Sequence, residues 1–348
     1  MTKTRSDARG QHYVPQMLQD AFTRPGKGKK PQLFVFDKHE DRVFKTSPEN
    51  ILHQRDFNTF ESEEASYCLE TGMGKVEDAA APVLRKIITS RSLAELTDDE
   101  RGALMVFVAL QQVRGVSVRA NMVDMVEQIR ERIRQEGQDP NTVPQLRGHD
   151  DPEQIKLSAL MLAGRNLAAL TAPYMTKAML LFAAEPGTRF YLGDTPVTMH
   201  NETDTGPYGN LGTEVEGIEI YMPIAPDLLL AFWCPSLVEV LQEGLLACER
   251  SLKNTAAAAL FGTRPEVIEL RRMRAELQVR QQRISDDIKA ILSQRPIESS
   301  SDNVDYLNSL QVAYAERYLV SSTNDFSLAR RMVAERPKAR RGMRGQLA

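Results

Sequence analysis

Two short segments with strand-like alternation interrupt a sequence whose hydrophobic pattern is otherwise helical. In the first, QLFVFDK and RVFKTS flank a turn, and Leu33, Val35 and Val43 alternate with polar neighbours, as in a half-buried antiparallel pair. The second runs from RFYL through VTMH to IEIYMPIAPDLLLAFWC and predicts four more strands. Helical periodicity fills most of the remaining chain, over about 63–90, 97–136, 153–184, 236–261, 264–292 and 302–320. We therefore predict an α+β fold, predominantly helical, with a mostly antiparallel sheet built from two β-rich islands.

The charge distribution suggests how the chain is organised. We expect one α+β domain over residues 1–328, with a strongly charged helical insertion at about 264–294 that is either a solvated face or a homo-oligomer surface. A basic tail, expected to be flexible, covers 329–348 and contains Arg330, Arg331, Arg336, Lys338, Arg340, Arg341 and Arg344. Such a tail either contacts nucleic-acid phosphates or is plain solvated chain, and the sequence leaves both open.

Cysteine usage and hydropathy bear on the compartment. Cys68, Cys234 and Cys248 lie far apart without a CxxC spacing, which disfavours a disulfide framework and a zinc knuckle. The longest apolar stretches, such as LLLAFWC, are much shorter than the ~20 residues that span a bilayer. We expect a cytoplasmic protein with no membrane partner.

Polar side chains fall inside an apolar stripe of the helix predicted around residue 110. Gln111 and Arg114 lie among residues such as Phe107 and Val108, and a buried arginine or glutamine needs partners because an unpaired one costs several kcal/mol. Gly115, on the same stripe, would let a ligand or another backbone approach closely. The alternative is a structural ion pair of Arg114 and a loop contact of Gln111.

Two other predicted helices show the same mixture of polar and apolar residues. Asn308 and Gln311 interrupt the apolar side of the last helix, and Glu70 and Glu77 lie seven residues apart on the border of the helix near residue 75. Two carboxylates on one flank can hold a metal ion, act as a base or pair with Arg114, although either alone is more often structural. Together these helices predict a buried polar cluster.

Two further candidates come from turns. Asp194, in YLGDTPV, follows a predicted strand and either bonds the amides of its own turn or faces a cleft. His12, in HYVPQMLQDAF, lies beside the start of a helix that Pro15 favours, where a neutral histidine could serve as a base or a phosphate contact. Gln16, in the same segment, is a candidate for substrate binding.

These segments, in order, resemble an uncharacterised family of microbial proteins, DUF4238. The resemblance covers almost the whole chain and rests on HYVPQMLQDAF, LFVFDK, QQVR, GDTPV, YMPIAP and LNSLQVAYAERYLV. The family's turn commonly has the sequence SDNPV, so Gly193 and Thr195 depart from it while Asp194 and Pro196 match. The resemblance implies no activity, because the family has none agreed.

The sequence allows three functions. The first is a hydrolase of a phosphate-containing substrate, such as a nuclease of bacterial defence. In it His12, Glu77, Arg114 and Asp194 are catalytic, Gln16, Gln111, Asn308 and Gln311 bind substrate, and the cofactor is unknown, a divalent metal ion being one option. The second is a non-catalytic nucleotide- or peptide-binding regulatory module. In the third, the cluster is purely structural and the charged helix at 264–294 mediates association.

Overall fold

The fold is built around a five-stranded sheet in the middle of the chain. The computed structural model describes residues 10–25, 30–61, 66–146, 148–149, 151–203, 209–259 and 263–345, so parts of the expected domain and tail, 1–9 and 346–348, lie outside the described residues. The strand order is β10-β11-β12-β8-β13. Its strands are β8 (Ala178–Ala184), β10 (Thr198–His200), β11 (Glu219–Ala225), β12 (Leu228–Trp233) and β13 (Ile297–Ser299). All neighbours are antiparallel except β13 and β8, which pair in parallel.

Both faces of this sheet are covered, and in its three central strands, β11, β12 and β8, alternate residues belong to different hydrophobic clusters. On β8, Leu181 packs into the main core, which includes side chains of α2 (Glu70–Ser90) and α3 (Asp98–Val113). Its neighbours Leu180 and Phe182 face the opposite side, where α9 (Ser301–Tyr314) covers the sheet. The strand therefore appears in the sequence as an unbroken apolar run, AMLLFAA, and its prediction as the end of a helix over 153–184 was wrong.

A second five-stranded sheet contains the predicted N-terminal hairpin. β3 (Pro31–Asp37) pairs with β4 (Arg42–Thr46), and the order β2-β3-β14-β9 completes the sheet with β2 (Arg24–Pro25), β9 (Leu192–Gly193) and β14 (Tyr318–Ser321). Two small pairs stand apart from it: β1 (Gly10–His12) with β5 (His53–Arg55), and β6 (Thr59–Glu61) with β7 (Ser66–Cys68). The α+β class with mostly antiparallel sheets is confirmed.

The helix predicted over 97–136 is two helices. A capping box of Thr97 and Glu100 starts α3 as predicted, but the chain turns at Gly115, whose backbone is extended (φ −77°, ψ 169°), and α4 (Val116–Gln135) begins there. The apolar side of α4 is not a core face, because Met125 is about half exposed and none of the apolar side chains of α4, all of which the structure describes, is fully buried. The remaining short helices are α1 (Gln16–Asp20), η1 (Pro48–Asn50), η2 (Pro140–Thr142), η3 (Pro144–Leu146), α5 (Pro152–Arg165), α6 (Leu167–Thr171) and η4 (Ala172–Thr176).

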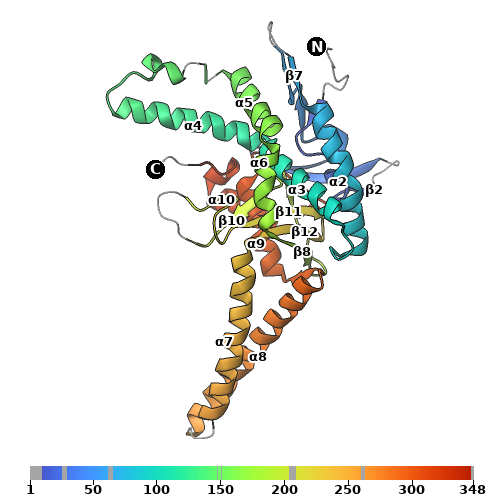
Figure 1. The fold of residues 1–348 in the computed structure, drawn as a ribbon, viewed down its shortest axis with the longest axis vertical. Helices are drawn as coiled ribbons and strands as arrows, with labels where there is room; N and C mark the ends of the chain where they lie inside the picture. Colours follow the sequence, from blue (N-terminus) through green and yellow to red (C-terminus); the bar gives the residue numbers. More distant parts are fainter. Residues whose placement is uncertain are drawn as a thin grey trace.

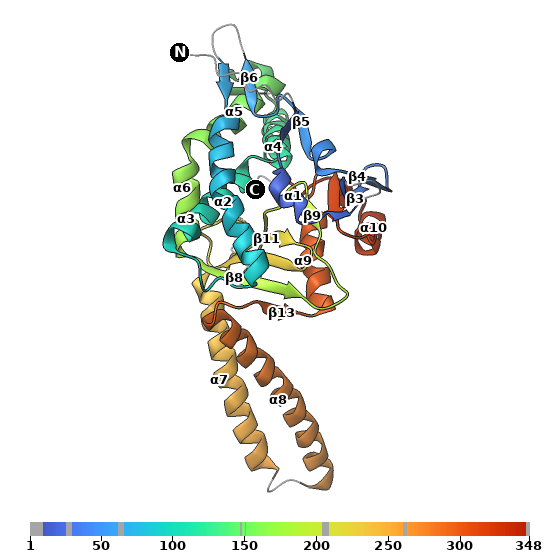
Figure 2. The same cartoon turned by 90° about the vertical axis from the view of Figure 1, so that its right-hand side faces the viewer.

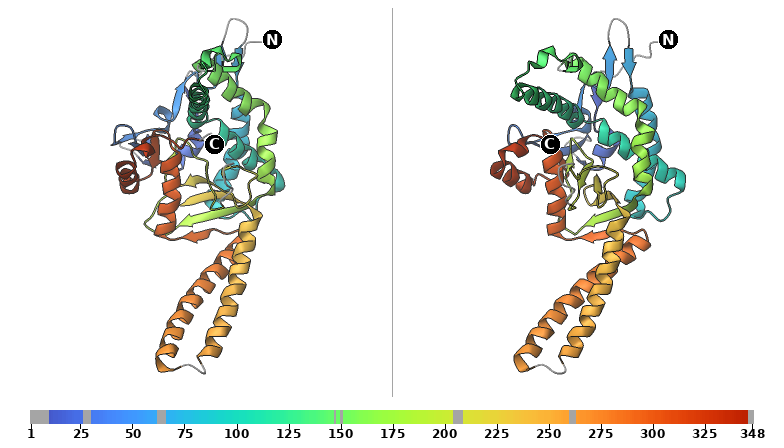
Figure 3. Two further views of the ribbon diagram at one scale, coloured as in Figure 1. Left: turned by 90° about the vertical axis from the view of Figure 1, so that its left-hand side faces the viewer. Right: turned by 60° about the vertical axis from the view of Figure 1, so that its left-hand side comes forward.

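A long helical hairpin projects from the body of the molecule (Figure 1). It consists of α7 (Pro235–Ala258) and α8 (Arg264–Leu292), which pack along each other and leave the body together (Figures 2 and 3). Large apolar side chains remain exposed on it, namely Val240, Leu246, Ile268, Met273, Val279 and Leu292. The charged segment at 264–294 is thus one arm of a hairpin whose other arm is α7.

The basic C-terminal segment is folded against the body rather than extended. Residues Ser327–Glu335 form α10, with Leu328, Ala329 and Val333 buried, and Pro337–Arg340 form a 3-10 turn, η6. Arg344 then contacts Glu316 at 2.6 Å. This differs from the expected flexible tail, and the reason is the apolar face of α10, which packs on Phe36 and Phe326. Within the described ranges, no helix is both long and apolar enough to cross a membrane.

Candidate functional site

The buried Arg114 binds two of the other predicted residues, the partly exposed Glu77 and the main chain of His12. Its side chain is 2% exposed, and one guanidinium nitrogen, Nη1, lies 2.5 Å from Glu77 Oε1. The other, Nη2, donates to the main-chain carbonyl of His12 at 2.5 Å. One turn earlier, Gln111 Nε2 donates to the carbonyl of Tyr13 at 2.7 Å. The predicted polar partners are therefore present, and they include the main chain on either side of the His12–Tyr13 peptide bond.

The ring of His12 takes no part in these contacts. Its Nε2 donates to the carbonyl of Pro48 at 3.1 Å and lies 3.4 Å from Gln16 Nε2, while the ring of His53 is 5.1 Å away. Burial lowers the pKa of His12, opposed by the Pro48 hydrogen bond. A neutral ring that donates through Nε2 keeps Nδ1 as an acceptor, so the side chain could still take a proton.

Asp194 is completely engaged by the main chain that follows α9. Its two carboxylate oxygens accept from the backbone N–H groups of Glu316, Arg317 and Tyr318 at 2.7, 2.7 and 2.8 Å, and the side chain is buried. Burial raises the pKa of Asp194 to about 6, although these three hydrogen bonds and the nearby Lys38 ammonium oppose the rise. Asp194 thus fixes the turn between α9 and β14.

Asn308 and Gln311, on α9 itself, fix the segment that contains Asp194. Asn308 accepts from the N–H of Tyr191 at 2.7 Å and donates to the carbonyl of Arg189 at 2.9 Å. Gln311 accepts from the N–H of Gly193 at 2.9 Å and donates to the carbonyl of Pro196 at 3.0 Å. Both amide ends of each side chain are occupied, which leaves little with which to bind a substrate.

The predicted residues therefore form two groups rather than one cleft. His12, Glu77, Arg114 and Gln111 gather around β1, and Asp194, Asn308 and Gln311 surround α9; Gly115 lies between the groups, close to the carbonyl of Asp194. The catalytic and substrate-binding roles stay predictions. Among the residues that the structure describes, no three histidine, cysteine, aspartate or glutamate side chains gather as a metal site.

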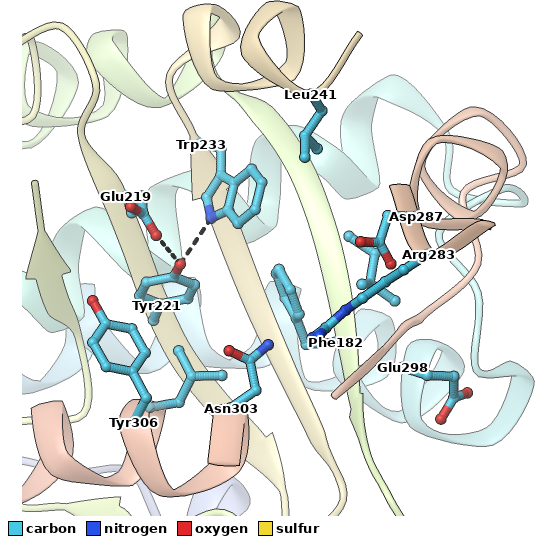
Figure 4. A pocket seen from close by; sticks show the side chains of 12 residues that line it. Phe182, Glu219, Tyr221, Trp233, Leu241, Arg283, Asp287, Glu298, Asn303 and Tyr306 are labelled. Carbon is cyan, nitrogen blue, oxygen red and sulfur yellow. Dashed lines mark hydrogen bonds between the residues drawn. The ribbon is translucent and has the colours of Figure 1, made fainter. Parts of the chain in front are cut away.

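A cavity that the sequence did not reveal lies where the α7–α8 hairpin meets the central sheet (Figure 4). Its volume is about 210 Å³, enough for a single ring or a short chain. Four strands of the central sheet (β8, β11, β12 and β13), α9 and both hairpin helices contribute its walls. The lining residues are Phe182, Glu219, Tyr221, Trp233, Leu241, Arg283, Asp287, Ile297, Glu298, Asn303, Tyr306 and Leu307.

A chain of hydrogen bonds crosses the sheet side of this cavity. Trp233 Nε1 donates to the hydroxyl of Tyr221 at 3.1 Å, and that hydroxyl donates to the carboxylate of Glu219 (Figure 4). The strand register brings these residues together, because Glu219 lies directly opposite Trp233 in the β11–β12 pair, and Tyr221 is two residues along on the same face. Burial raises the pKa of Glu219, opposed by the Tyr221 hydroxyl and by His200.

The opposite side of the cavity is formed by α8 and α9. Asp287 and Arg283, one helical turn apart on α8, lie across the cavity from Glu219 (Figure 4). From α9, Asn303 projects between the two sides, and Tyr306 lies on the side of Glu219. Burial raises the pKa of Asp287, and Arg283 opposes this rise. The cavity thus combines four aromatic side chains with carboxylates at both ends, and small-molecule sites likewise combine aromatic walls with a few polar groups.

Two sequence signals could have pointed to this cavity. Trp233 is the only tryptophan of the chain, and Glu219 is a carboxylate at the start of an otherwise apolar strand. Neither is informative alone, because the site depends on the pairing of β11 with β12 and on the position of α9.

Comparison with known proteins gives one match. A family model described as a protein of unknown function matches residues 10–325. No curated protein and no solved structure matches the chain. The resemblance found in the sequence motifs is therefore confirmed, and no relative supplies an activity.

Proposed function

Because the chain belongs to DUF4238, a family of unknown function, we propose its function from its own geometry: a non-catalytic binding module for a small molecule. The observation that carries the proposal is the cavity at the base of the hairpin, with its partly buried hydrogen-bonded group of Trp233, Tyr221 and Glu219. Most of the polar side chains predicted to be catalytic or to bind substrate are instead bonded to main-chain groups. Binding without turnover needs only such a preformed pocket.

Native mass spectrometry of the purified protein tests this proposal. We expect the wild-type protein to retain a small molecule of unchanged mass, without dependence on divalent ions, and Glu219→Gln to lose most of it. The matched control is Glu243→Gln, since Glu243 is an exposed glutamate of α7 outside the cavity lining. Retention that is equal in wild type and Glu219→Gln, or absent from wild type at all concentrations tested, would contradict the proposal.

A second candidate is the hydrolase of a phosphate-containing substrate, for example a nuclease in bacterial defence. The observation that favours it is the half-buried His12 ring, which has a lowered pKa and lies beside Gln16 and His53. A neutral imidazole is the form that acts as a general base.

Nuclease and phosphodiesterase assays, with and without Mg²⁺, test this second candidate. If it is correct, His12→Ala loses activity by about 10²-fold or more, the usual contribution of a general base, and His39→Ala, at an exposed histidine, does not. Undiminished activity of a folded His12→Ala protein rules His12 out.

We also propose that the protein forms a homo-oligomer, contacts nucleic acid and is located in the cytoplasm. Association into a homo-oligomer through the hairpin is supported by its exposed apolar side chains, such as Ile268 and Val279. Nucleic-acid contact would fall to the basic residues of the C-terminal segment, of which Arg340 and Arg344 already have protein partners. A cytoplasmic location fits the free Cys68, Cys234 and Cys248.

A further inference from the structure

We propose that the cavity at the base of the hairpin binds an organic cation, with its ammonium group on Glu219 and its apolar body against Tyr221, Trp233 and Phe182. This inference rests on the proposed function, because it names the ligand class of the same cavity.

Glu219 supplies the negative charge. Its carboxylate accepts a hydrogen bond from Tyr221 but forms no ion pair with any lysine or arginine within the described part of the chain. The ionisable groups that face it are His200 and Glu202 from the β10 side, Tyr221 on its own strand and Tyr306 on α9. A carboxylate that is largely withdrawn from water without a full cationic partner is stabilised by a ligand that brings one.

The aromatic rings beside Glu219 form the part of the cavity that would contact the apolar body and the charge of an organic cation. Phe182 lies against both other rings of the sheet wall, with centroids 6.1 Å from Tyr221 and 5.5 Å from Trp233. The face of an aromatic ring attracts a cation through the ring's quadrupole, and tryptophan does so most strongly. The rings also bury the methylene or aryl part of an amine. An ammonium group would therefore meet both a carboxylate and π-systems.

The charges of the remaining wall disfavour an anion. Asp287 and Glu298 add two carboxylates to that of Glu219, while Arg283 is the one cationic side chain among the residues that line the described cavity. Arg283 lies four residues before Asp287 on α8 and already interacts with it. A phosphate or carboxylate in this cavity would face net repulsion, which is why we place a cation rather than a nucleotide here.

Three probes of nearly equal shape test the inference: phenethylamine, 2-phenylethanol and 3-phenylpropionate. Trp233 lines the cavity and is the only tryptophan, so its fluorescence reports occupancy directly. We expect the amine to bind at least tenfold more tightly than the alcohol and the acid. Glu219→Gln should weaken amine binding about tenfold and leave the alcohol unchanged, whereas the control Glu243→Gln should leave all three unchanged.

The outcomes separate this inference from the proposed function. If the alcohol or the acid binds as tightly as the amine, the cavity is a ligand site but the cation assignment is overturned. If no probe alters Trp233 emission, the cation assignment is also overturned, and the mass spectra of the retained ligand then decide on the proposed function. If Glu219→Gln fails to fold, the order of the three probes on the wild-type protein decides alone.

Discussion

Replacing Asp194 with asparagine tests whether burial or hydrogen bonding has the larger effect on the pKa of this carboxyl group. Burial raises its pKa from an ordinary 3.8 to about 6. An acid whose folded pKa is raised contributes stability that is fully present below the unfolded pKa and is lost as the pH rises through the folded pKa. With these two values, the wild-type protein should lose about 1.4 kcal/mol of unfolding free energy between pH 5 and pH 8 relative to Asp194→Asn, which cannot titrate.

Urea unfolding followed by Trp233 fluorescence measures the difference. The variant serves as the reference at each pH, so the titration of other groups largely cancels. The competing effect is the set of three backbone N–H donors, which favours the ionised form. A difference between the two proteins that does not change from pH 5 to pH 8 would refute the reasoning, because it would show that these donors keep Asp194 ionised throughout.

Three other perturbations follow from the contacts. Arg114→Met removes the bonds to Glu77 and to the His12 carbonyl and should lower the unfolding free energy by about 3–5 kcal/mol, measured by urea unfolding against Arg55→Met at an exposed ion pair. Ile268→Glu with Val279→Glu should reduce the oligomeric mass in sedimentation if the hairpin associates, and an unchanged mass counts against association. Changing Arg331, Arg336 and Lys338 to glutamine should lower the salt dependence of any duplex DNA binding by up to about 2.7 in the slope of log K against log salt, and an unaltered slope would exclude these three residues from phosphate contact.

The sequence pattern predicted the helices and strands that have one apolar and one polar face. It did not predict elements whose type or end is set by contacts with distant parts of the chain. The β3–β4 hairpin was predicted from the alternation of Leu33, Val35 and Val43, and it forms. Strand β8 was missed because a strand buried on both faces has no period-two pattern that separates it from a buried helix. Strand β14 was missed for another reason: no glycine or proline separates α9 from YLVS. The helix ends there because Asp194 binds the next three N–H groups and the fully buried Lys38 binds the carbonyls of Val312 and Ala315.

The sequence predicted that these polar side chains would be buried and hydrogen-bonded, but not which groups they would bind. Gln111, Arg114, Asn308 and Gln311 were expected to need polar company inside the fold, and they are buried with hydrogen bonds. Most of those bonds go to main-chain groups of distant segments, and a helical pattern gives no information on where such segments lie. The need of these four side chains to hold distant main-chain segments together therefore explains why they are polar and buried. The cavity depends on the pairing of β11 with β12, which cannot be inferred from either strand alone.

The hairpin links the two kinds of partner that we propose. Helix α8 carries Ile268 and Val279 on exposed positions, and nearer its end it carries Arg283 and Asp287 into the wall of the cavity. It then leads within a few residues into β13, which pairs with β8 of the central sheet. A ligand in the cavity would therefore contact the sheet and the hairpin at once, and association along the hairpin would involve the same helix. Because the two sets of side chains are separate, variants of Ile268 and Val279 report on association, and variants of Glu219 report on the ligand.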